Sequence, residues 1–200
     1  MQDLNTEQNI LNAAILVFQR KGMAGARMQE IADEAKINKA MLHYYFRNKQ
    51  LLFEAVFMQA FSQLAPQLNL IFASNDTVFE KIRKFNSNYI DFILKNPYLP
   101  TFIIQELNNN PEFVKKFMVH GNKPDPNPFL LQIEKEITLG KIKKIKPKQL
   151  LLNLLSLSVF PFVAKTMLKL VMDVSDQEFL ELMEERKTLI SEQIINSIKV

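Results

Sequence analysis

Two short stretches with helical spacing lie close together in residues 27–49, and this window constrains the fold more than any other part of the chain. In the first stretch the apolar residues recur at the spacing of one helical face: Met28, Ile31, Ala32 and Ala35. The second stretch follows Asn38, a favoured N-cap residue, and its inner side carries Leu42 and Phe46. Two short helices joined by a few residues predict a helix-turn-helix.

The opposite face of the second predicted helix carries side chains suited to duplex DNA. Lys39 and Ala40 point away from the core and reach furthest toward base edges, since a helix fits the major groove, about 12 Å wide. His43 and Tyr44 can donate to the sugar-phosphate backbone and fix the register. Lys49, at the start of the next predicted helix, stands beside backbone N–H groups that attract phosphate.

The same window resembles the DNA-binding motif of TetR-family transcriptional regulators. Its motif positions are filled without a gap by Met28, Ile31, Ala32, Ala35, Ile37, Leu42, Tyr45, Phe46 and Lys49. Residues 10–22 resemble the family's first helix, and residues 138–155 resemble its loop entering the eighth helix. We therefore expect these DNA-binding residues: Arg27, Met28, Asn38, Lys39, Ala40, Met41, His43, Tyr44, Tyr45 and Lys49.

The window departs from the family pattern at a few positions. Ala26 and Arg27 stand where the family usually has threonines, so the second helix loses its hydroxyl cap, although Arg27 can reach a phosphate. Lys36 replaces the turn glycine, which costs about 1 kcal/mol if this residue adopts a positive φ. His43 replaces a frequent tyrosine, and its phosphate contact is expected to be sensitive to pH.

Composition agrees with this reading and excludes other classes. The chain has 200 residues, a net charge of +4, no cysteine and two histidines. Residues 20–49 hold seven basic and three acidic residues, so this window alone accounts for the net charge. No disulfide, cysteine-ligated metal, phosphate-cradling glycine loop or catalytic histidine–carboxylate spacing is present. We expect no catalytic residue, no metal site, no cofactor and no enzymatic activity.

The remaining residues predict helices, because no alternating strand pattern bounded by hairpin turns occurs. The expected fold is all-α with about nine helices: a three-helix head in residues 1–50, and a helical regulatory and dimerisation domain in residues 51–200. The first helix is expected to be capped by Thr6 and to end near Gly22. Further helices are expected at residues 28–35, 39–46, 48–66, 77–95, 100–107, 111–120, 129–138, 148–172 and 176–198.

The middle of the body is rich in aromatic residues and poor in charge, which suits a cavity for a flat or hydrophobic ligand. The candidate lining residues are Tyr89, Phe92, Phe102, Phe117, His120 and Phe162. Packing of these rings in the core is the alternative, and His120 at a helix end can simply face the negative pole of the helix dipole. The TetR resemblance implies a ligand that shifts the middle helices and changes the spacing of the DNA-binding heads.

The last two predicted helices are expected to form the dimer interface. Residues 150–164 are uncharged, but Asn153, Ser156 and Pro161 interrupt them and the stretch is too short to span a membrane. Pro161 should kink its helix. The final helix has one apolar face: Phe179, Leu182, Met183, Leu189, Ile190, Gln193, Ile194 and Ser197. The resemblance implies a four-helix bundle across a two-fold axis, which places two recognition helices about 34 Å apart.

These observations favour a homodimeric repressor that binds a palindromic operator and is released by a small, largely apolar ligand. A DNA-binding regulator controlled by a protein partner is the alternative, and a helical enzyme is the least supported class. The polar N-terminus, with Asp3 and Glu7, is unlike a signal peptide, so we expect a cytoplasmic protein. The lysine-rich connector at residues 141–148 suits a solvated loop better than a second nucleic-acid site.

Overall fold

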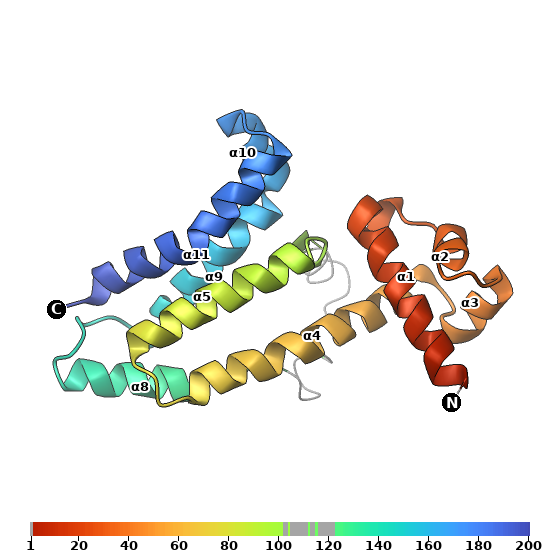
Figure 1. The fold of residues 1–200 in the computed structure, drawn as a ribbon. Coiled ribbons are helices and arrows are strands. Elements are labelled where there is room, and N and C mark those ends of the chain that lie inside the picture. The colour runs from red at the N-terminus through yellow and green to blue at the C-terminus, as the bar shows by residue number, and fades with distance from the viewer. Residues whose placement is uncertain (1, 102–103, 105–111, 113–114, 116–122) are drawn as a thin grey trace. The chain divides into compact units, whose positions relative to one another are not determined.

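The computed structural model describes residues 2–101, 104, 112, 115 and 123–200, with the side chains of 2–4 left aside. Its helices are α1 (Gln2–Gly25), α2 (Met28–Glu34), α3 (Lys39–Tyr45), α4 (Lys49–Ala73), α5 (Val78–Lys95), α8 (Asn127–Thr138), α9 (Pro147–Val163), α10 (Lys165–Met172) and α11 (Asp176–Ile198) (Figure 1). Over these residues the only β pairing is an isolated bridge between Ile142 and Lys199. The all-α prediction is confirmed, whereas most of the helices expected at 100–107 and 111–120 lies outside the described residues.

The chain forms two compact units. The first comprises Met1–Gln63 and Asn96–His120, and the second comprises Leu64–Lys95 and Gly121–Val200. Helix α4 therefore begins in the first unit and ends in the second. The expected domain boundary at residue 50 stays a prediction.

Several helix limits differ from those expected. Helix α1 begins at Gln2 instead of after Thr6, because the preceding residues include no proline or glycine that would stop a helix. Its regular backbone ends at Gly22, where φ is 65°, as expected. Helix α4 continues past Pro66 to Ala73. A proline inside a helix removes one hydrogen bond but does not always end it when the surrounding residues are packed.

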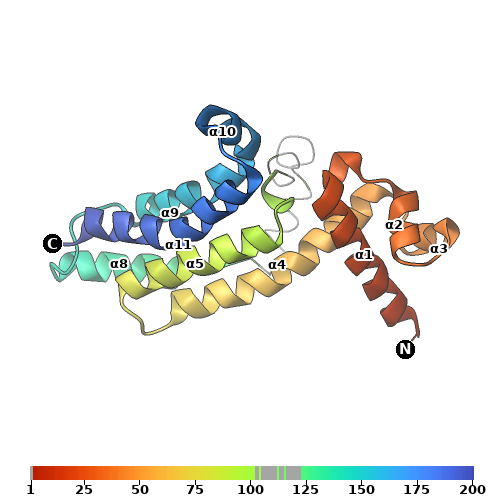
Figure 2. The same cartoon turned by 45° about the horizontal axis from the view of Figure 1, so that its top comes forward.

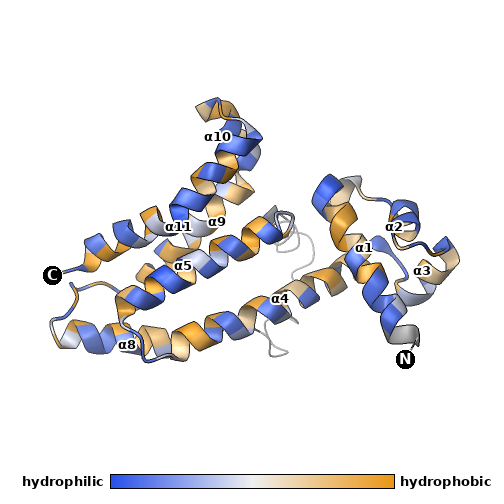
Figure 3. Cartoon of the chain, in the orientation of Figure 1, coloured by the Kyte–Doolittle hydropathy of each residue, from blue (hydrophilic) through white to orange (hydrophobic). Residues whose placement is uncertain are grey.

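The second unit is built on three helices that pack side by side: α5, α9 and α11 (Figure 2). Orange and blue segments alternate along α5 and α11 in Figure 3, as expected for helices that bury one face. At their centre, the fully buried Asn86 of α5 donates to the carbonyl oxygens of Arg186 (3.0 Å) and Lys187 (2.8 Å) and accepts from the hydroxyl of Ser158 (2.7 Å). This network satisfies a buried amide and joins all three helices.

The single helix expected at residues 148–172 is instead two helices, α9 and α10, with a bend of 76° between them. Pro161 lies one turn before the break and cannot donate to the carbonyl of Leu157. The guanidinium of Arg186 takes that carbonyl at 2.9 Å. The helix breaks at Ala164, three residues after Pro161. The distortion expected at Pro161 is therefore present, but it is a break between two helices instead of a kink, and it lies closer to the C-terminus.

None of the described helices is by itself long and apolar enough to cross a bilayer, and α9 with α10 meet that requirement only when counted together across their bend.

Candidate nucleic-acid interface

The turn between α2 and α3 is held by two backbone hydrogen bonds. Lys36 N donates to Asp33 O (3.1 Å) and Ile37 N donates to Ala32 O (3.0 Å). This is the Schellman pattern, which places the residue after the C-cap in the left-handed region and favours glycine there. Lys36 occupies that position with φ of 55°. The strain expected for a lysine at this turn is therefore present.

Helix α3 is held by a side-chain cap at its N-terminus and by buried apolar side chains on its inner side. The Asn38 side chain accepts from Met41 N at 2.7 Å, which confirms the expected cap. Leu42 is fully buried and Phe46 is buried, so the predicted inner side is correct. The outer side is exposed over Lys39, Ala40, Met41, His43 and Tyr44, and the Tyr44 side chain is 82% exposed. The structure thus gathers the central expected DNA-binding residues on one free face.

Two aromatic side chains and a histidine occupy the end of this face. The ring centroids of Tyr44 and Tyr45 lie 5.4 Å apart in an edge-to-face arrangement. Tyr45 is half-buried, so this contact orients the exposed ring of Tyr44. His43 Nδ1 lies 3.0 Å from the carbonyl oxygen of Arg47, so Nδ1 carries the proton. A neutral ring of that tautomer has only a lone pair on Nε2. His43 can therefore donate to a phosphate through Nε2 only when it is protonated.

Two of the three acidic residues of α2 form ion pairs with helix α1. Arg20 pairs with Glu34, and Lys21 Nζ lies 2.8 Å from a carboxylate oxygen of Glu30. The Lys21 hydrogen bond holds the pKa of Glu30 below its usual range. These pairs are exposed and contribute little stability.

The basic residues around the recognition helix are left without acidic partners. Over the described part of the chain, no ion pair engages the cations nearest α3: Arg27, Lys36, Lys39 and Arg47. The head therefore pairs Glu30 and Glu34 with α1 and leaves cations without ion pairs around the turn and α3. Sequence reasoning counted these charges without finding this separation, because the pairing depends on where α1 packs.

Lys49 has a structural role that the sequence did not indicate. Its Nζ donates to the carbonyl oxygens of Ala24 (3.3 Å) and Ala26 (3.0 Å), at the connection between α1 and α2. These carbonyls follow the end of the regular helix at Gly22, and a lysine is well suited to satisfy them. Lys49 thus links the start of α4 to the head, and its contact with a phosphate stays a prediction.

The expected ligand-pocket residues are only partly within the described residues. Phe162 belongs to a buried cluster with Ile90 and Phe179, and Tyr89 and Phe92 pack against it. Tyr89 also stacks on Phe85, with ring centroids 5.3 Å apart, and burial raises the pKa of Tyr89 to about 12. Phe102, Phe117 and His120 lie outside the described residues. The three described candidates are thus brought together as packed side chains of the core.

The fold and this surface define a helix-turn-helix DNA-binding protein with a helical body. Residues 10–56 match the family model "Bacterial regulatory proteins, tetR family". The match covers 47 of the 200 residues and assigns the head, and the named relatives below are transcriptional regulators.

Relatives with curated names support the assignment. The chain is 32% identical over 104 residues to the HTH-type transcriptional repressor NicS of Pseudomonas putida, a match that covers 50% of this chain and 48% of NicS. It thus spans about half the length of that relative. It is 27% identical over 141 residues to the Staphylococcus aureus IcaR, a negative transcriptional regulator of the biofilm operon icaADBC, with 70% of this chain and 74% of IcaR covered.

Solved structures share the whole fold. A transcriptional regulator of the TetR/AcrR family from Thermobifida fusca superposes with a TM-score of 0.67 at 18% identity, covering 94% of this chain and 97% of that one. The hemolysin II transcriptional regulator HlyIIR superposes with a TM-score of 0.61 at 22% identity and covers 98% of both chains. At these identities the likeness concerns the fold alone.

Proposed function

We propose that this protein is a homodimeric transcriptional repressor that binds a palindromic operator through α3. The observation that carries the proposal is the exposed face of α3, where Lys39, Ala40, His43 and Tyr44 are free to enter a major groove. The names of NicS and IcaR, a repressor and a negative regulator, support repression. A bacterial repressor works where the chromosome lies, so we place the protein in the cytoplasm.

The dimer proposal is supported by a division of α11 into two apolar faces. The predicted single face is in fact split, because Met183 and Ile190 are buried inside the unit whereas Leu182 and Leu189 are not. Leu189 is 60% exposed, and Phe160 of α9 is exposed as well. An exposed apolar stripe on two adjacent helices fits a self-complementary two-fold interface.

Selection of bound duplexes from random DNA tests the operator. We expect an inverted repeat whose half-sites are separated by about one helical turn or a small multiple of it. Lys39→Ala should change the base preference within each half-site. Lys49→Ala should weaken all sites by a similar factor and lower the salt slope by about 1. Lys144→Ala, on the exposed connector, is the matched control. Equal loss on every sequence from both head variants contradicts the assigned roles.

Sedimentation of a charged variant tests the interface. Leu189→Glu should convert the dimer to a monomer and weaken operator binding, because a carboxylate would have to be buried against the partner. Leu70→Glu places the same charge on an exposed leucine of α4 and should leave the dimer intact. A fully dimeric Leu189→Glu protein would exclude this face as the interface.

A small, largely apolar effector at Tyr89, Phe92 and Phe162 is our proposal for how repression is relieved, and control by a protein partner is the alternative. Mass spectrometry of the organic extract of purified protein separates the two. A stoichiometric apolar compound that elutes with the protein and lowers operator affinity supports the effector. An empty protein whose operator affinity changes only on addition of a cell protein supports the partner.

A further inference from the structure

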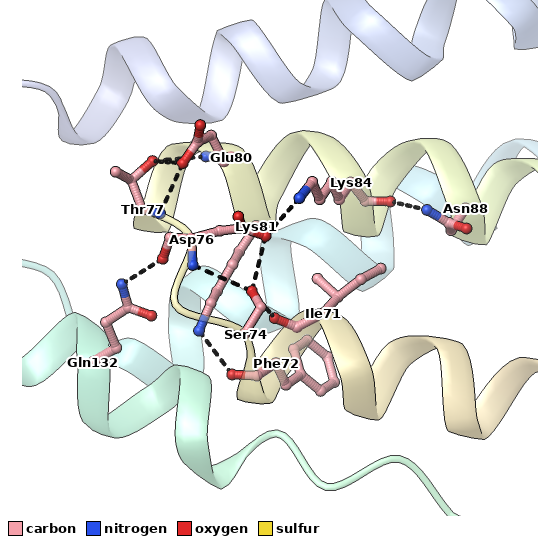
Figure 4. Close-up of polar contacts among 10 residues, drawn as sticks. All are labelled: Ile71, Phe72, Ser74, Asp76, Thr77, Glu80, Lys81, Lys84, Asn88 and Gln132. Carbon is pink, nitrogen blue, oxygen red and sulfur yellow. Dashed lines mark hydrogen bonds and ion pairs between the residues drawn. The ribbon is translucent and has the colours of Figure 1, made fainter.

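A buried lysine holds the end of α4. Lys81, on the first turn of α5, is 3% exposed, and its Nζ donates to the carbonyl oxygen of Phe72 at 2.8 Å (Figure 4). The last carbonyls of a helix lack partners within the helix, so this bond satisfies one of them. An ammonium group has three N–H donors. Burial lowers the pKa of Lys81, because the charged form has lost water.

The carboxylates nearest to Lys81 are occupied by other groups. Asp76 accepts from Lys84 Nζ at 2.6 Å and from the Ser74 hydroxyl at 2.8 Å. Glu136 accepts from the side-chain amide of Gln132 at 2.9 Å. Within the described ranges no ion pair reaches Lys81. The charges of Asp76 and Glu136 still favour the ammonium, but neither carboxylate pairs with it directly, which is an unusual arrangement for a buried charge.

Lys81 lines a hollow of about 440 Å³ between the end of α4 and helix α8. Lys135 of α8 and Lys141, just after it, also line this hollow, and among the described lining residues Glu136 is the one carboxylate. Three ammonium groups against one carboxylate make the hollow favourable for an anion.

The same hollow has apolar walls. Phe72 lies at its inner end, and Leu131 and Leu139 lie at its rim. Leu131 is 64% exposed and Leu139 is 57% exposed, so neither is used to build the core. A volume of this size is within the range of small-molecule sites, which combine apolar walls with a few placed polar groups.

We propose that this hollow binds a small amphipathic carboxylate, with its charged group at Lys81 and its hydrocarbon part against Leu131 and Leu139. Three ammonium groups against one carboxylate favour an anion, and the exposed leucines favour an apolar body over a plain inorganic anion. The site is separate from the Tyr89–Phe162 cluster proposed for the effector. It does not depend on the DNA-binding proposal, because its occupancy is measured without DNA.

Calorimetry with sodium octanoate on the full chain tests the site. Octanoate should bind at least about tenfold more tightly than 1-octanol, which lacks the charge, and than inorganic phosphate, which lacks the hydrocarbon. Lys81→Met should reduce octanoate affinity about tenfold or more. Lys144→Met removes an exposed lysine that does not line the hollow and should bind within about twofold of the parent chain.

A second variant keeps the test decisive if Lys81→Met does not fold. Leu131→Ser changes only an exposed side chain and should also weaken octanoate about threefold to tenfold, whereas Leu70→Ser, an exposed leucine outside the hollow, should not. Amide shifts of Ser74 and Gln132 on octanoate addition place the ligand in the hollow. Equal affinity for octanoate and octanol, parent-like binding by Leu131→Ser, or shifts confined to other regions would each overturn the proposal.

Discussion

Replacing Lys36 by glycine should stabilise the DNA-binding head. Lys36 has a φ of 55°, and the backbone bonds from Lys36 N and Ile37 N to the end of α2 require that conformation. The left-handed region costs a residue with a Cβ about 1–2 kcal/mol, and glycine avoids this cost. Glycine in turn gives the unfolded chain extra entropy worth about 0.4–1 kcal/mol. The difference predicts a gain of about 0.5–1 kcal/mol in the free energy of unfolding of the head.

Native-state hydrogen exchange is the suitable assay, because the chain has two units and the gain belongs to one of them. The amides of Ile31 and Leu42, whose side chains are fully buried, report opening of the head. Their protection should rise about twofold to fivefold in Lys36→Gly. Lys36→Ala removes the same charge but keeps the Cβ, so it should give no gain. Equal protection in the two variants would refute the strain argument, since it would assign the effect to charge.

Three further outcomes follow from single contacts. Asn38→Ala should cost the head about 1 kcal/mol in the same exchange measurement, because it removes the cap of α3. Asn86→Ala should lower the free energy of urea unfolding by about 3 kcal/mol, because it removes the buried network. The control Asn88→Ala removes an amide that bonds to Lys84 within α5, and it should lower this free energy by less than about 0.5 kcal/mol. Similar losses in the two variants would contradict the role of the network. Burial raises the pKa of Tyr89 to about 12 from the ordinary value of 10.0, so the unfolded state loses its proton first. Stability should therefore fall as the pH rises between these values, and it should fall less in Tyr89→Phe, which still contains Tyr98, whose pKa burial also raises to about 12.

Local signals in the sequence are sufficient to predict the head. The Asn38 cap, the Leu42 and Phe46 spacing and the strained Lys36 turn each involve residues at most a few positions apart. Interactions of this range are determined by backbone geometry and hold in almost any tertiary context. The same is true of the capping box that Ser175 and Glu178 form at the start of α11.

Predictions that needed tertiary packing were incomplete. Periodicity found the apolar residues of α11 but could not separate Met183, which packs inside, from Leu189, which stays exposed, because both are apolar at helical spacing. It also joined α9 and α10 into one helix. The break depends on Pro161 together with Arg186, which takes the carbonyl that the proline leaves free.

Several polar contacts connect parts of the chain that sequence periodicity cannot bring together. Lys49 reaches carbonyls more than 20 residues away, and Asn86 bonds to a carbonyl 100 residues away. Lys81 is buried because the end of α4 folds back beside α5, although nothing in its own sequence marks it as a core residue. The composition and spacing of residues therefore specify a helix-turn-helix and an all-helical body. The packing of helices that are far apart in the chain decides which cations face the proposed DNA surface, which cap a helix and which line a hollow.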